Sequence, residues 1–164
     1  MEIGLVVTPG KVDGLQVGER RAGGIADLPA SHQALLAGPV TAVMSTVNRT
    51  GSVQLTPVWV LRDRERLLIN SVRGRLKDRN LRARPQVTLC LVNPENAFHW
   101  LSIQGRVVEI IDEDDPERGS EATSTINEGT KLYMGLDEYP VRDPRGEVRS
   151  LYFVEIDRVM AMGE

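Results

Sequence analysis

Runs rich in apolar and β-branched residues recur along most of the chain and are separated by turn-forming residues. The runs 40–47 (VTAVMSTV) and 52–61 (SVQLTPVWVL) flank Asn48 to Gly51, whose Asn and Gly favour a tight turn. We therefore expect these two runs to pair as an antiparallel hairpin. The same pattern predicts further strands over 66–71, 87–92, 100–111 and 150–160, with a β-bulge at Gly105.

Three segments carry the start or stop signals of helices. A short helix is predicted over 29–37, ended by Gly38 and Pro39, and a basic helix over 74–82, ended before Pro85. Pro116 is typical of a first helical turn, so a third helix is predicted over 116–127. Strands joined by short connections, with two or three helices, predict a mainly β fold: an antiparallel barrel with helices packed at its ends.

The first 27 residues differ from the rest of the chain. They are rich in glycine and charged residues and show little periodicity, so we expect an N-terminal extension that forms a flexible arm. Residues 28–164 are expected to form one domain, because a chain of 164 residues with 41% hydrophobic side chains suits a single core.

Composition narrows the range of partners. The 20 basic and 23 acidic side chains give a net charge of -3, which offers no broad attraction to nucleic acid or to an anionic membrane. With one cysteine, Cys90, and two histidines, we expect neither an internal disulfide nor a metal site. This inventory suits a reducing cytoplasm. Because the net charge offers no broad attraction to anions, any site for an anion must be local.

One segment does have the chemistry of a local anion site. Over 71–81 (SVRGRLKDRNL) a strand ends and a basic helix begins. A helix N-terminus with free backbone N–H groups, the hydroxyl of Ser71 and the cations of Arg75 and Lys77 is well suited to a phosphate. The alternative interpretation is an amphipathic helix whose charges face water, and composition alone does not separate the two.

Several segments, taken in order, resemble a known family. They are 42–60 (AVMSTVNRTGSVQLTPVWV), 67–92 (LLINSVRGRLKDRNLRARPQVTLCLV), the strand from Trp100 to Glu109, and the closing SLYFVEIDRVMAMG. The set resembles the flavin-binding split β-barrels related to pyridoxamine phosphate oxidase, and in particular their deazaflavin-dependent actinobacterial branch. The resemblance implies a split β-barrel of the FMN-binding type and a homodimer in which two barrels share each cofactor.

The resemblance also implies roles for individual residues. Ser71, Arg75 and Lys77 match positions that hold the cofactor phosphate, and Asn80 matches the helix that supports them. Trp100 matches an aromatic position near the ring, contributed by the partner chain, and Tyr133 matches a region that closes the site. The complete set of cofactor-binding residues implied is Gln54, Thr56, Pro57, Val58, Trp59, Asn70, Ser71, Arg75, Lys77, Asn80 and Trp100. From the residues alone, Trp59 and Trp100 could equally be packed core tryptophans.

The function expected from the resemblance is hydride transfer between the reduced 8-hydroxy-5-deazaflavin coenzyme F420 and an electron-poor small molecule. Such a cofactor carries the chemistry itself, and no side chain is identified as a catalytic acid or base. One alternative is an FMN-dependent oxidoreductase of the same fold. Another is a non-catalytic protein that binds a flavin, F420 or haem. The pyridoxamine phosphate oxidase reaction is less expected, because the sequence shows no second basic cluster for a phosphorylated substrate.

Overall fold

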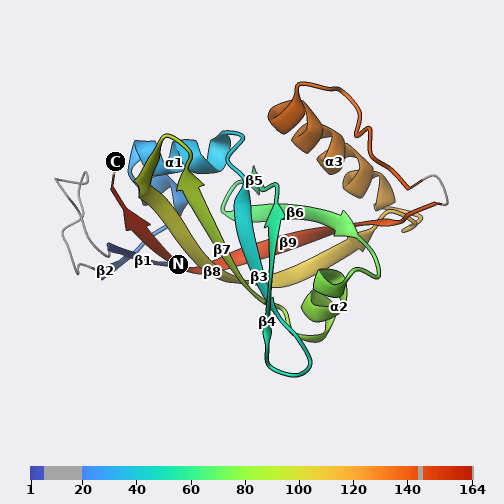
Figure 1. Ribbon diagram of the computed structural model, residues 1–164, viewed down its shortest axis with the longest axis horizontal. Coiled ribbons are helices and arrows are strands. Elements are labelled where there is room, and N and C mark those ends of the chain that lie inside the picture. Colours follow the sequence, from blue (N-terminus) through green and yellow to red (C-terminus); the bar gives the residue numbers. More distant parts are fainter. Residues whose placement is uncertain (6–19, 144–145, 164) are drawn as a thin grey trace.

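A computed structural model describes residues 1–5, 20–143 and 146–163 of the chain (Figure 1). In these ranges the strands are β1 (Glu2–Leu5), β2 (Arg20–Ala22), β3 (Ala42–Val47), β4 (Val53–Val58), β5 (Leu61–Asp63), β6 (Arg66–Val72), β7 (Gln86–Asn93), β8 (Asn96–Asp112) and β9 (Arg149–Met162). The helices are α1 (Ala30–Ala37), α2 (Leu76–Ala83), α3 (Gly119–Met134) and the short 3-10 turn η1 (Ile25–Asp27).

The described strands form one mixed sheet that is almost entirely antiparallel. Its order is β2-β1-β9-β8-β7-β3-β4, and β6 pairs with both β5 and β9. The hairpin of β3 and β4 has the predicted antiparallel register, with Val47 opposite Val53. A mainly β fold with three helices was predicted and is confirmed. Among the described residues, no helix combines the length and the hydropathy needed to cross a bilayer.

The predicted bulge at Gly105 is also present. The register between β8 and β9 shifts between Gln104 and Gly105. A Cβ atom at Gly105 would lie 2.3 Å from the carbonyl oxygen of Glu155, so the two strands approach too closely there for any side chain. The bulge therefore depends on glycine for space, as well as for the local irregularity in pairing.

The two described ends of segment 1–27 are ordered into the fold, although the sequence shows little periodicity there. β1 runs parallel to β9, with Ile3 opposite Val159, and β2 pairs with β1. The side chains of Ile3 and Ile25 are fully buried in the main core. Ile3 and Ile25 anchor these short elements, and elements of three or four residues are too short to show a period. The predicted flexible arm otherwise falls on 6–19, which lie outside the described residues.

The helices take up three different positions around the barrel (Figure 1). Leu35 and Leu36 of α1 and Leu81 of α2 enter the main core, so these two helices cover the barrel interior. α3 packs instead on the outer side of β6, β8 and β9, where Ala122 joins a second, smaller cluster with Leu151. Figure 1 accordingly shows α2 and α3 on opposite sides of β6 and β9.

A buried carboxylate fixes the start of α2. Asp78 is 2% exposed and accepts hydrogen bonds from the Gly74 amide at 2.7 Å, the Tyr152 hydroxyl at 2.6 Å and Arg82 Nε at 2.7 Å. Burial and the bond to Asp78 raise the pKa of Tyr152, which keeps this hydroxyl a donor. Gly74 has a positive φ of 84°, so the turn between β6 and α2 needs both a glycine and this carboxylate.

We expect Asp78→Asn to lower the free energy of unfolding by about 2 to 4 kcal/mol, because it removes a buried charge that serves three donors. Urea denaturation followed by circular dichroism measures this change. Asp114→Asn is the matched control: Asp114 is 57% exposed and pairs with Arg73 on the surface, so its loss should cost less than about 1 kcal/mol. Equal losses in the two variants would contradict the role given to Asp78.

Candidate functional site

A cavity of about 180 Å³ lies where the end of β4, the end of β6, the start of α2 and one face of α3 meet. The connection from α3 to β9 also contributes to its wall. The residues that line it are Thr41, Pro57, Val58, Trp59, Leu61, Leu68, Asn70, Ser71, Arg75, Lys77, Thr125, Ile126, Gly129, Tyr139 and Arg149. Segments far apart in the sequence therefore build one concave, partly apolar site, as ligand pockets commonly are.

Two cations and a hydroxyl line the part of the cavity formed by β6 and α2. Ser71 is the second-last residue of β6. Arg75 is the N-cap of α2, and Lys77 lies in the first turn of that helix. The Ser71 hydroxyl is buried and has no hydrogen-bond partner among the described residues. Neither cation forms an ion pair with a carboxylate of the described chain. These groups are free to bind an anion from outside.

The electrostatics of this corner favour an anionic ligand. Burial, and then the nearby charge of Arg75, lower the pKa of Lys77 below its ordinary value of 10.5. No aspartate or glutamate is found among the described residues that line the cavity. A phosphate placed here would offset the repulsion between the two cations and raise the pKa of Lys77 again.

Asn80 lies behind this corner rather than in it. Its side-chain amide is 3% exposed and donates to Thr46 Oγ1 at 3.0 Å and to Asn48 Oδ1 at 2.8 Å. Thr46 in turn donates to Gln54 Oε1 at 3.3 Å. Asn80 and Gln54 thus connect α2 to the β3–β4 hairpin, and neither lines the cavity. The supporting role that the family resemblance implies for Asn80 stays a prediction.

Aromatic side chains form another part of the wall. Trp59 stacks on Tyr133 with ring centroids 5.0 Å apart and meets Tyr139 edge-on at 6.0 Å. The Tyr133 hydroxyl accepts from the Val60 amide at 3.2 Å and donates to the Val40 carbonyl at 3.0 Å. Tyr133 belongs to α3 and therefore fixes Trp59 against that helix. It does not line the cavity itself, so any part it has in closing the site would act through Trp59.

Trp59 packs close to α3 at Gly129. A Cβ atom at this position would lie 3.4 Å from Cε3 of Trp59, in ordinary van der Waals contact, so the helix approaches the indole to within the space of a methyl group. Trp59 is only half-buried and follows the last residue of β4, so it is not the packed core tryptophan that strand alternation allows.

Other predicted residues divide between the cavity and the barrel. Pro57, Val58 and Asn70 line the cavity, and Asn70 donates its amide to the Ala122 carbonyl at 2.8 Å while its buried Oδ1 has no partner among the described residues. Thr56 pairs with the buried Met44 and does not line the cavity.

Trp100 lies elsewhere, on β8, opposite Val92 of β7 and Met162 of β9. It does not line this cavity, and its implied role in a partner's site stays a prediction. No cofactor-binding assignment is tested by geometry alone, and the assignments stay predictions.

Sequence reasoning missed several cavity residues. Arg149 begins β9 and Tyr139 lies in an irregular segment, so neither has a motif, and only the pairing of β9 with β6 brings Arg149 to the cavity. Thr125 and Ile126 belong to α3, whose apolar face is the one signal that could have indicated a wall.

Comparisons with known proteins agree with this arrangement. The profile of the pyridoxamine 5'-phosphate oxidase family matches residues 28–149, which include all of the cavity-lining residues given above. No curated protein matches the chain. Among solved structures, an F420 reductase is 25% identical with a TM-score of 0.66, over 80% of this chain and 98% of that one.

Two more distant structures share the fold alone. A putative pyridoxamine 5'-phosphate oxidase from Listeria innocua is 15% identical with a TM-score of 0.56, over 79% of this chain and 93% of that one. HutZ, a heme storage protein from Vibrio cholerae, is 14% identical with a TM-score of 0.58, over 79% of this chain and 91% of that one. The predicted split β-barrel is confirmed, and the chain belongs to the pyridoxamine 5'-phosphate oxidase family.

Proposed function

We propose that the protein is an oxidoreductase that binds a phosphorylated flavin-type cofactor, the deazaflavin F420, in this cavity and transfers a hydride between F420 and an electron-poor small molecule. The observation that carries the proposal is the corner formed by Ser71, Arg75 and Lys77: within the described ranges, two cations have no carboxylate partner and the buried hydroxyl beside them has no hydrogen bond. A phosphate satisfies all three groups at once. The F420 reductase among the structural relatives supports the choice of cofactor.

When bound, F420 would supply the hydride chemistry through its ring system. The chain would supply position and environment. Arg75 and Lys77 would hold the phosphate, while Trp59 and the apolar side chains beside it would keep water from the ring. The unpartnered Oδ1 of Asn70 offers an acceptor in the same cavity. We assign no side chain as an acid or base: the hydride step itself involves none, and water supplies the proton that completes the reduction.

FMN is the alternative cofactor, since its phosphate would use the same three groups. The haem-binding alternative finds less support. The chain has two histidines, His32 and His99, and their rings contact each other at 4.5 Å. His32 is fully buried and donates from Nε2 to the Met162 carbonyl at 3.1 Å, and His99 is 3% exposed. Both rings would have to leave these positions to bind a haem iron.

Fluorescence titration tests the cofactor directly: we expect F420 to bind more tightly than FMN. In the same assay Lys77→Ala should weaken F420 binding by about tenfold to a hundredfold, because a hydrogen bond to a charged group contributes about 1.5 to 3 kcal/mol. If FMN bound more tightly than F420, the proposed cofactor would be FMN, and the proposed binding site would stay the same.

Arg79→Ala is the control on the same helix. Its side chain is exposed and does not line the cavity, although it contacts the Gly74 carbonyl, so the loss in affinity should be small. If Lys77→Ala and Arg79→Ala weakened binding equally, the charge of the whole helix would account for the data better than a defined phosphate site.

A homodimer is part of the proposal, and an apolar sheet face supports it. Cross-strand partners project on the same side of a sheet, and register places Leu55, Val43, Cys90, Val92 and Trp100 on one side of β4, β3, β7 and β8. Val43 is 42% exposed, Leu55 66% and Val92 42%. A contiguous exposed apolar face of this kind marks an interaction surface. We call these five residues the apolar sheet face.

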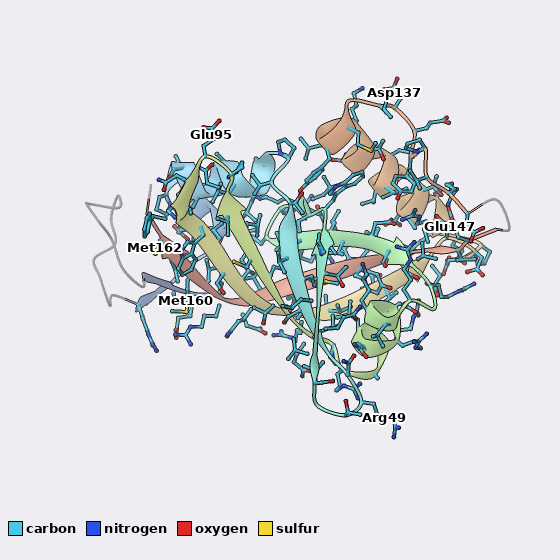
Figure 2. The ribbon with its side chains drawn as sticks, viewed as in Figure 1. Arg49, Glu95, Asp137, Glu147, Met160 and Met162 are labelled. Atoms are coloured by element: carbon cyan, nitrogen blue, oxygen red, sulfur yellow. The ribbon has the colours of Figure 1, made fainter. Side chains whose placement is uncertain are left out.

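A second copy is the occupant that fits this face. Pro57 continues it, pairing with Val43, and also lines the cavity, so the cavity and the apolar sheet face share an edge. A partner seated here would cover the cavity and could bring its own Trp100 towards it. Figure 2 shows Met160 and Met162 together at the end of β9; Met160 pairs with Ser102 and Met162 with Trp100, so both extend the same surface.

Leu55→Asp should therefore convert the dimer to monomers, because it places a charge in an interface that, for a stable dimer, buries on the order of 1,600 Å² in total. Size-exclusion chromatography with light scattering measures the mass. Val141→Asp is the matched control, since Val141 is 67% exposed and lies on the connection between α3 and β9. A wild-type monomer that binds cofactor would contradict the shared site.

A further inference from the structure

Arg149 is a buried cation in the cavity wall that has no role in the phosphate corner, the site formed by Ser71, Arg75 and Lys77. It is the first residue of β9 and pairs with Val72 of β6, next to the pair formed by Ser150 and Ser71. Its side chain is 4% exposed, and its guanidinium carbon lies 4.3 Å from the centroid of the Tyr139 ring. Stacking on tyrosine covers one face of the guanidinium and leaves its N–H edges to find acceptors.

Those edges are incompletely used. Nε and Nη2 of Arg149 have no hydrogen-bond acceptor within the described part of the chain. Glu147 Oε1 lies 2.7 Å from Nη2 without hydrogen-bond alignment, and it too is a buried atom without a hydrogen-bond partner. Burying polar groups of this kind without hydrogen bonds is costly.

A purely structural ion pair predicts a different geometry. Arginine and a carboxylate that serve only each other commonly meet through two parallel hydrogen bonds. Here neither Nε nor Nη2 of Arg149 makes such a bond to a described residue, and Oε1 of Glu147 also lies 3.8 Å from Nε of Arg142. Glu147 lines a neighbouring hollow rather than the cavity, and Figure 2 shows it just before β9, at the opposite end of that strand from Met162. The carboxylate is thus a partial counter-ion placed outside the cavity.

We propose that Arg149 binds an anionic group of the cavity's ligand, a carboxylate or a phosphate, and that this group replaces Glu147 as the partner of the guanidinium. The inference rests on the proposed function in one respect, that the cavity holds a ligand. The anion can come from the cofactor, as its phosphate, or from the substrate. In either case Glu147 competes with the ligand for Arg149, so the two residues have opposite effects on affinity.

The opposite signs make the test sharp. If the anion is the cofactor's, Arg149→Gln should weaken binding of F420 and FMN by about tenfold or more, and Glu147→Gln should strengthen it by about twofold to tenfold; if it is the substrate's, the same opposite effects should appear in the binding of benzoate. Arg149→Lys keeps the charge but loses the planar fork, so it should fall between wild type and Arg149→Gln. A residue that only stabilises the fold would not give opposite effects at two members of one ion pair.

Paired ligands identify the source of the anion. Riboflavin and the phosphate-free deazaflavin differ from FMN and F420 in lacking the phosphate. If Arg149→Gln weakens only the phosphorylated ligands, the anion is the cofactor phosphate. If cofactor binding is unchanged, but benzoate raises the melting temperature of the cofactor-loaded wild type at constant ionic strength and not that of Arg149→Gln, the anion belongs to the substrate.

Two results would overturn the proposal. One is that Arg149→Gln and Glu147→Gln shift affinity in the same direction, and the other is that neither changes the binding of any of these probes. Failure of the proposed function has its own signature, which is that wild type binds neither F420 nor FMN. In that event inorganic phosphate replaces them as the probe, and a rise in melting temperature that Arg149→Gln abolishes supports the anion site, while an equal rise in both proteins rejects it.

Discussion

The hydrogen bonds accepted by Asp78 join three parts of the chain that the site requires. One bond holds the amide of the turn at Gly74, one holds Tyr152 of β9, and one holds Arg82 within α2. Arg82 also donates hydrogen bonds to the Asp112 carboxylate and, at 3.0 Å, to the Ser150 hydroxyl. Because Lys77 is the neighbour of Asp78, the position of the cation follows from that of the carboxylate. A negative charge thus orients the positive ones from behind, where it is shielded from the cavity.

This division of charge explains how a protein with a net charge of -3 can present a cationic cavity. The carboxylates near the site face away from it: Asp78 into α2 and β9, and Glu147 into the neighbouring hollow. The cavity retains Arg75, Lys77 and Arg149. Holding like charges together costs stability, and an anionic ligand would return it, so binding and resistance to unfolding should rise together.

Much of the fold followed from local patterns. The β3–β4 hairpin was predicted from its turn residues, the bulge from Gly105, and the basic helix from Pro85 and the composition before it. The grouping of Ser71, Arg75 and Lys77 in one part of the cavity wall was predictable because they lie within seven consecutive positions of the sequence.

The remainder of the cavity could not be predicted in this way, since it depends on pairing between distant segments. Arg149 reaches the wall only because β9 pairs with β6, and Tyr139 lies in a segment without periodicity. Asp78 looked like one charge among several on an exposed helix, whereas tertiary contacts bury it. The third helix also begins later than Pro116 suggested, at Gly119, and continues to Met134.

The pairing of β9 has a consequence for how the protein is made. β9 lies between β1, β6 and β8, all of which precede it in the chain and leave the ribosome earlier. Until β9 emerges, β6 and β8 have no strand between them, Asp78 lacks its bond to Tyr152, and the cavity lacks Arg149. Long-range pairing of this kind is slow to form. A nascent chain that lacks β9 therefore has an incomplete cavity, and the proposed cofactor site forms only once this strand has paired.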